Sequence, residues 1–159
     1  MIPIKRILVP TDFSEPAHAA LRLATTFAQE FGSRLYLLHV IPEPYTFPYG
    51  PELSTVPMTD ILAQAEEGAR EHLDKLAAST ALPPDRLVTR ALIGTPVDQV
   101  LALAAEEDID LIVLGTHGRG MVGHLLLGSV AERVVRRSPV PVLTVHGKET
   151  AAASKTTAA

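Results

Sequence analysis

The chain alternates short apolar runs with longer amphipathic stretches. The runs are almost continuous in Val, Ile and Leu: Ile7 to Val9, Leu35 to Val40, Leu87 to Leu92, Leu111 to Leu114 and Val140 to Val145. Because few polar residues interrupt them, these runs are typical of strands buried on both faces, as in a parallel sheet covered by helices. The pattern therefore predicts five buried strands with helices on both sides.

The stretches between these runs have helical periodicity and the signals of helix ends. From Ser14, apolar residues recur at intervals of three and four as far as Phe31, with Ser14 as the expected N-cap and Gly32 at the stop. Three more helices are expected at about Thr59 to Ser79, from Thr95 to about Ala104, and from about Ser129, with Val130, Val134 and Val135 buried. Strands and helices in turn predict an α/β fold with an open parallel sheet.

Two segments fall outside this alternation. Residues 41–58 contain five prolines and three of the chain's aromatic residues, so we expect a long connection there, which patches the surface or an interface or closes over a site. The tail, residues 147–159, is small and polar, and we expect it to be disordered. The remaining residues, 1–146, are expected to form a single domain.

The composition narrows the class of protein. With 159 residues, 47% of them hydrophobic, the chain can bury a substantial core. A net charge of -4 makes nucleic acid an unfavourable partner, and no apolar run approaches the roughly 18 residues of a membrane span. The absence of cysteine excludes disulfides and a thiol nucleophile and fits a reducing compartment. We therefore expect a soluble cytoplasmic protein that binds neither nucleic acid nor membrane.

Polar and glycine residues follow the strands at the ends where a ligand is expected. In open α/β sheets, ligands bind outside the carboxyl ends of the strands, near the point where the strand order reverses. The residues that follow the first four strands are Pro10, Thr11 and Asp12, then His39 and Val40, then Gly94, then a glycine-rich stretch.

This glycine-rich stretch, GTHGRGMVGHLLLGS at residues 115–129, allows three readings. Gly118, Gly120 and Gly123 give the dinucleotide pattern G-x-G-x-x-G, but they follow a fourth strand and the next strand does not end in an acid. Residues 123–129 have the outline of a P-loop without its lysine, so they lack the group that reaches the β and γ phosphates. Both of these readings are therefore unfavourable.

The third reading takes the outer glycines as G-x2-G-x9-G-S. Gly115 and Gly118 would let a backbone pass close to a sugar or phosphate, while Gly128 and Ser129 would open a helix whose free N–H groups suit an anion. The alternative is that the glycines serve tight turns and that Ser129 is only an N-cap. The spacing by itself leaves both interpretations open.

Three motifs together resemble the universal stress protein family: LIVLG followed by G-x2-G-x9-G-S, ILVPTDFSEPAHAAL near the amino terminus, and SPVPVLTV. The resemblance runs from about Ile4 to Val145. It implies a five-stranded parallel sheet in the order 3-2-1-4-5, with Asp12 beside the glycine-rich stretch. It also implies a homodimer that pairs through the last strand, Val140 to Val145.

The intact glycine motif resembles that of ATP-binding members of the family. For the base and sugar, the resemblance implies that Pro10 and Thr11 line the adenine side, that the backbone of Val40 faces the adenine edge, and that Asp12 holds a ribose hydroxyl. It further implies that Gly115 and Gly118 pass close to ribose and phosphate. The phosphates themselves would be bound by Gly128, Ser129 and Val130. His117 and Arg119 are side chains that could approach a triphosphate. No carboxylate pair is evident, so Mg²⁺ or Mn²⁺ would be held mainly by phosphate oxygens.

The sequence shows no nucleophile paired with a general base, so any hydrolysis of nucleotide is expected to be slow. Three hypotheses remain: a dimeric ATP-binding stress protein with a regulatory role, an interaction module that binds no nucleotide, and a slow nucleotide hydrolase that uses the same pocket.

Overall fold

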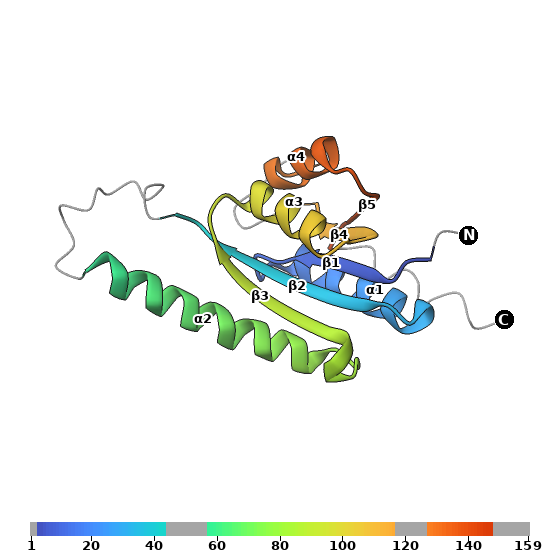
Figure 1. Ribbon diagram of the computed structural model, residues 1–159, viewed down its shortest axis with the longest axis horizontal. Helices are drawn as coiled ribbons and strands as arrows, with labels where there is room; N and C mark the ends of the chain where they lie inside the picture. The colour runs from blue at the N-terminus through green and yellow to red at the C-terminus, as the bar shows by residue number, and fades with distance from the viewer. Residues whose placement is uncertain (1–2, 44–56, 117–126, 148–159) are drawn as a thin grey trace.

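The computed structural model describes residues 3–43, 57–116 and 127–147. They form a five-stranded parallel sheet between two layers of helices (Figure 1). The strands are β1 (Arg6–Pro10), β2 (Arg34–Ile41), β3 (Leu87–Ile93), β4 (Leu111–Gly115) and β5 (Val142–Val145). Their order, β3-β2-β1-β4-β5, is the one that the family resemblance implies, and the predicted fold class is confirmed.

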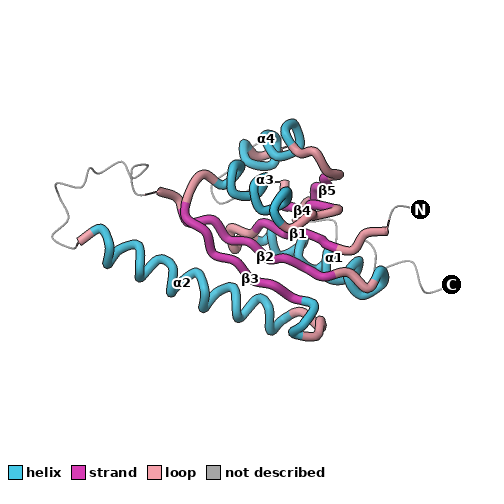
Figure 2. The backbone as a smooth tube through the Cα atoms, in the orientation of Figure 1, coloured by secondary structure: helices cyan, strands magenta, loops and turns pink. Residues whose placement is uncertain are grey.

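Helices cover both faces of this sheet. They are α1 (Glu15–Phe31), α2 (Met58–Ser79), α3 (Pro96–Glu106) and α4 (Ser129–Arg137), with a short 3-10 helix, η3 (Pro84–Arg86), before β3. Figure 2 shows α2 on one side of the strands and α3 with α4 on the other. The helix α1 shares the face of α2, because both contribute to the same cluster of buried residues.

The alternation of side chains along each strand divides the core in two. Ile7 and Val9 of β1 pack with Leu35 of β2 against α1 and α2, whereas Leu8 packs with Tyr36 against α3 and α4. Each central strand is therefore buried on both faces, which is why its sequence is continuously apolar.

The predicted ends of α1 are confirmed. The Ser14 hydroxyl accepts a hydrogen bond from the Ala17 amide at 3.4 Å, and Gly32 closes the helix in the left-handed conformation at φ 69°. Thr95 is also the N-cap of α3, but no hydrogen bond from the described residues joins its side chain to the helix. In both cases the sequence identifies the position at which the helix begins.

Two predicted burial positions are wrong. Val130 and Val135 are 38% and 44% exposed, while Val134 alone of the three valines in α4 is fully buried. The helix α4 packs against α3 and the short edge strand β5, and only a narrow stripe, Ala131 and Val134, reaches the core.

Two predicted boundaries also differ. The last strand begins at Val142 rather than Val140, because the Ser138 hydroxyl bonds to the backbone of Val140 and holds a turn there. The helix α4 has Gly128 as its N-cap, so Ser129 is its first helical residue and not the cap. Of the predicted long connection, residues 44–56 lie outside the described part, as do residues 148–159 of the predicted tail.

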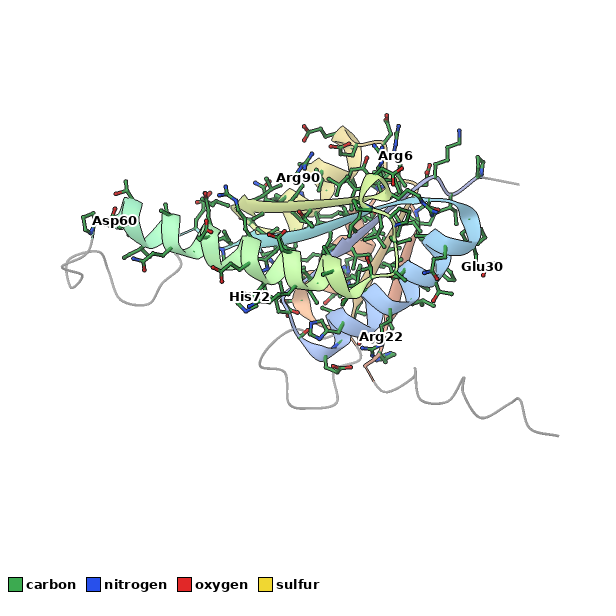
Figure 3. The ribbon with its side chains drawn as sticks, turned by 90° about the horizontal axis from the view of Figure 1, so that it is seen from below. Arg6, Arg22, Glu30, Asp60, His72 and Arg90 are labelled. Atoms are coloured by element: carbon green, nitrogen blue, oxygen red, sulfur yellow. The ribbon has the colours of Figure 1, made fainter. Side chains whose placement is uncertain are left out.

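The helix α2 is the most exposed element of the layer it shares with α1. Its buried residues are Ala69 and Leu73, both in its middle and C-terminal turns. Figure 3 shows the other end, marked by Asp60, reaching away from the strands. Within the described ranges, the helices all fall short of the length and apolarity that a membrane crossing requires.

Candidate functional site

The strand order reverses between β1 and β4, the two central strands. From β1 the chain crosses over α1 to β2 on one side, and from β4 it crosses over α4 to β5 on the other. The helices that follow these two strands lie on opposite faces of the sheet. The carboxyl ends of β1 and β4 therefore border a crevice between α1 and α4, where open α/β sheets bind ligands.

A cavity of about 350 Å³ occupies this crevice. The predicted site residues that line it are Pro10, Thr11, Asp12, Val40, Gly115, Gly128, Ser129 and Val130. They come from the ends of β1, β2 and β4 and from the start of α4, so the fold brings together residues more than 100 positions apart. The other predicted residues, His117, Gly118 and Arg119, lie outside the described residues.

The cavity also has walls that were not predicted as site residues. They are Ala17, Leu38, His39, Pro96, Val100, Leu114, Thr116 and Ala131. Most are apolar core residues, which no motif marks in a sequence. His39 and Thr116 are exceptions, because the sequence places His39 at the strand ends where a ligand is expected, and Thr116 directly follows Gly115 and could have been found from that position.

Backbone hydrogen bonds hold the loop from Thr11 to Ser14 on one side of the cavity. The Thr11 amide donates to the Leu38 carbonyl of β2 at 2.8 Å. The Thr11 hydroxyl accepts from the Phe13 amide at 3.1 Å, and the Asp12 Oδ1 accepts from the Ser14 amide at 3.0 Å. One carboxylate oxygen of Asp12 thus closes a local turn, and the same residue borders the cavity.

His39 supports the same loop from β2. Its Nδ1 lies 2.8 Å from the Thr11 carbonyl oxygen. Since a carbonyl oxygen can only accept, Nδ1 carries the proton, and a neutral imidazole then has its lone pair on Nε2. The hydrogen bond therefore fixes the tautomer of a side chain that lines the cavity.

The start of α4 borders the other side. The Gly128 amide donates to the Thr116 carbonyl, which ties the start of α4 to the end of β4. No side chain of the described residues caps α4, and its first-turn amides have no acceptor within the helix. Such amides, with the positive end of the helix dipole, favour an anion in the cavity.

Thr116 also connects this region to β5. Its amide donates to the Val145 carbonyl at 3.0 Å, and its hydroxyl lies 2.9 Å from Nδ1 of His146. The side chain is almost completely buried, at 1% exposure. Thr116 therefore fixes the position of β4's end relative to both α4 and the last strand.

Gly115 has a structural role that the sequence did not reveal. A Cβ at this position would lie 2.6 Å from the carbonyl carbon of Pro16, which is closer than real contacts allow. The glycine lets the first turn of α1 pack directly on β4. It lines the cavity as predicted, but its missing side chain makes room for α1.

Metal-binding side chains are not grouped here. Among residues 3–43, 57–116 and 127–147, no three His, Asp or Glu side chains come together in a way that could hold a metal ion. A metal bound at this cavity would depend on oxygens from the ligand or on residues outside those ranges.

Comparisons with known proteins agree with this architecture. The model of the universal stress protein family matches residues 3–146. A universal stress protein of Thermus aquaticus is 36% identical over 142 residues, which cover 89% of this chain and 98% of that protein. Universal stress protein MJ0577 of Methanocaldococcus jannaschii is 30% identical over 155 residues, covering 91% of this chain and 96% of that protein.

Solved structures extend the comparison to three dimensions. The structure of MJ0577 has a TM-score of 0.76 at 30% identity and covers 91% of this chain and 97% of its own. A universal stress protein in complex with cAMP has a TM-score of 0.65 at 27% identity and covers 92% of this chain and 99% of its own. That neighbour binds an adenine nucleotide.

Proposed function

Since the chain belongs to the universal stress protein family, we propose that it binds ATP in the cavity between β1 and β4 and acts as a dimeric regulator in the stress response. The observation that carries the proposal is the composition of the cavity wall. Thr11 and Asp12 face the same 350 Å³ space as the uncapped start of α4. Hydrogen-bond acceptors for a sugar and donors for phosphates thus stand on opposite sides of one cavity.

The apolar walls suit the base of the nucleotide. Val40, Pro96 and Val100 line the cavity together with Pro10, and they offer flat or branched apolar surfaces to an adenine ring. In this arrangement Asp12 accepts from a ribose hydroxyl, while Gly128, the Ser129 side chain and the amides of Ser129 and Val130 surround the phosphates. The structure with cAMP supports an adenine nucleotide as the ligand class.

Residues 117–126 supply the rest of the proposed site. His117 and Arg119 are proposed to approach the phosphates, with Gly118 close to the ribose. A divalent ion, Mg²⁺ or Mn²⁺, is proposed to be held by the phosphate oxygens, in keeping with the lack of a metal-binding cluster among the described side chains.

The proposed regulator is a homodimer that works in the cytoplasm and has little catalytic activity of its own. The strand β5 is at the edge of the sheet, and no strand of the described residues pairs with its outer side, where a second copy could pair. Pairing two copies of β5 would remove this edge from solvent. The lack of cysteine in the chain agrees with a reducing compartment.

The direct test is calorimetric titration of the purified protein with ATP and Mg²⁺, together with analysis of any nucleotide released on heat denaturation. We expect saturable binding of ATP. If neither experiment detects adenine nucleotide, the proposal is wrong and an interaction module without a ligand becomes the better account. Turnover of ATP that is lost in Asp12→Asn would instead favour the hydrolase.

Asp12→Asn is the matched variant for the ribose contact. Asparagine keeps an oxygen that can accept from the Ser14 amide, so the local turn should survive. Loss of the charged acceptor is expected to weaken ATP binding by about tenfold, as for a charged hydrogen bond. Asp60→Asn, on the far end of α2, is the control and should bind ATP like the parent protein.

A further inference from the structure

Phe13 has a backbone conformation that is unfavourable for its residue type. Its φ is 63°, in the left-handed region. Among the described residues other than glycine, only Asp108 shares a positive φ, and aspartate tolerates that region far better than a bulky aromatic residue. Such a conformation persists only where surrounding contacts hold it.

The contacts that hold Phe13 come from three different elements. Its amide donates to the Thr11 hydroxyl within its own loop. Its ring lies 4.4 Å from the His39 ring of β2 and 5.1 Å from the His72 ring of α2, measured between centroids. Figure 3 shows His72 on the side of α2 that points towards α1. The phenyl ring is thus clamped between two imidazoles.

The neighbours of Phe13 connect this clamp to the cavity. Thr11 and Asp12 line the cavity, as does His39, whereas Phe13 does not belong to its lining. His39 bonds to the Thr11 carbonyl, and Asp12 bonds to the Ser14 amide. A change in the φ of Phe13 would rotate the peptide between Asp12 and Phe13 and would break this set of bonds.

We propose that Phe13 is a positioning residue for the nucleotide site, which aims the Asp12 carboxylate at the ribose through its left-handed backbone, and that His72 of α2 reinforces it. This inference rests on the proposed function, because it assigns Asp12 to a ribose hydroxyl. The helix α2 contributes no described residue to the cavity lining. Through His72, it would nevertheless be one of the elements that set nucleotide affinity and ribose selectivity.

Two substitutions at Phe13 separate the ring from the backbone. Phe13→Gly removes the ring but leaves a residue that adopts φ 63° freely, whereas Phe13→Ala removes the ring and keeps the steric conflict of a Cβ. We expect ATP affinity in the order parent, Phe13→Gly, Phe13→Ala, with the alanine variant weaker by on the order of tenfold. His72→Ala, at an exposed position, should weaken ATP binding by less than Phe13→Ala.

The readout specific to positioning is ribose selectivity. Each protein is titrated with ATP, 2′-deoxy-ATP and 3′-deoxy-ATP, and the ratios of dissociation constants are compared. For the deoxy-ATP that lacks the hydroxyl held by Asp12, the dissociation constant of the parent protein should exceed that for ATP. The ratio of these two constants should fall towards one in Phe13→Ala. Phe27→Ala is the matched control, because Phe27 packs against the same core from the middle of α1. It should lower thermal stability without changing the ratios.

The outcomes separate the role of Phe13 from the proposed function. If the parent protein binds no adenine nucleotide, the proposed function fails and the role of Phe13 fails with it. If the parent binds ATP but Phe13→Ala keeps the parental affinity and ratios, or binds no more weakly than Phe13→Gly, the positioning role alone is overturned. A change of the same size in the Phe27→Ala ratios would also overturn it.

Discussion

Two glycines differ in whether the packing around them requires glycine. Gly115 at the end of β4 faces the backbone of Pro16, and an added Cβ would approach it to 2.6 Å. Gly68 lies in α2, where an added Cβ would meet nothing within 4 Å. The first glycine permits a close contact between α1 and the sheet, whereas alanine could replace the second without a steric clash.

Gly115→Ala is therefore expected to destabilise the protein. The added Cβ would meet the carbonyl carbon and oxygen of Pro16, so β4 or α1 must move, at a cost of about 1–3 kcal/mol in the free energy of unfolding. Gly68→Ala should have the opposite effect and raise this free energy by about 0.5–1 kcal/mol. Chemical denaturation of both variants measures the difference. Equal stability of Gly115→Ala and the parent would contradict the close packing.

Residue-level prediction from the sequence succeeded where local chemistry decides the outcome. Ser14 caps α1 and Gly32 ends it, since caps depend on residues a few positions apart. Burial of Val130 and Val135 was predicted wrongly, because periodicity shows that a helix has an apolar face but not how much of it the sheet can cover. The steric reason for Gly115 involves Pro16, almost 100 residues away, which no local pattern reveals.

At the scale of elements, Arg86 joins the start of β3 to the end of α1. Its guanidinium donates to the carbonyl of Ser33, from Nε at 3.1 Å, and to that of Ala28. The Ala28 carbonyl belongs to the last turn of α1 and also accepts from the amides of Gly32 and Ser33, and the negative end of the helix dipole there favours a cation. Arg86 thus adds a charged donor to the backbone bonds that close the C-terminus of α1.

Arg86→Met is expected to lower the free energy of unfolding by about 1–3 kcal/mol, because it leaves partly buried carbonyl groups without a charged donor. Arg90→Met in β3, four residues further along the chain, is the control. Arg90 lies 3.7 Å from Glu107 in an exposed ion pair, which is worth at most about 1 kcal/mol. Thermal unfolding of the two variants tests this order. A larger loss in Arg90→Met would refute the role given to Arg86.

The strands themselves were the most predictable elements. Continuous apolar runs located all of them, since both faces of a covered parallel sheet demand apolar residues. The exception is the start of β5, where Val140 extends the apolar run but precedes Pro141 and lies in a turn held by Ser138. Composition alone does not separate an apolar turn from a strand.

At the scale of the whole molecule, the cavity depends on the strand order. The alternation of strands and helices predicts an open parallel sheet, but the strand order was predicted only from the family resemblance. Strand adjacency is set by packing between segments that are far apart in the chain, such as Ile7 beside Leu111. Once the order is known, the ends of β1 and β4 become neighbours, and the predicted residues that the structure describes line one cavity.

The outer edge of β5 provides a test of the proposed dimer. The carbonyls of Pro141 and Val145 accept from the amides of Ile112 in β4 and of Thr116 just after it, so by alternation the amide of Thr144 points away from β4. Thr144→Pro removes that outward amide and should convert the dimer to a monomer, as measured by light scattering. Its fold, measured by circular dichroism, should be retained.

Leu143→Pro is the matched control for this edge. The Leu143 amide points towards β4 by the same alternation, so proline there should disrupt the sheet and lower the unfolding temperature. A Thr144→Pro protein that remains folded and dimeric would show that the copies do not pair through β5.

The bond between the Gly128 amide and the Thr116 carbonyl has a consequence for how the family fold can diversify. It brings both ends of the intervening stretch to one point on the scaffold, so that stretch is a closed insert. The entropy of closing such an insert grows only slowly with its length, by about 0.6 kcal/mol per doubling. A change in the length of this stretch is therefore expected to cost the sheet little stability.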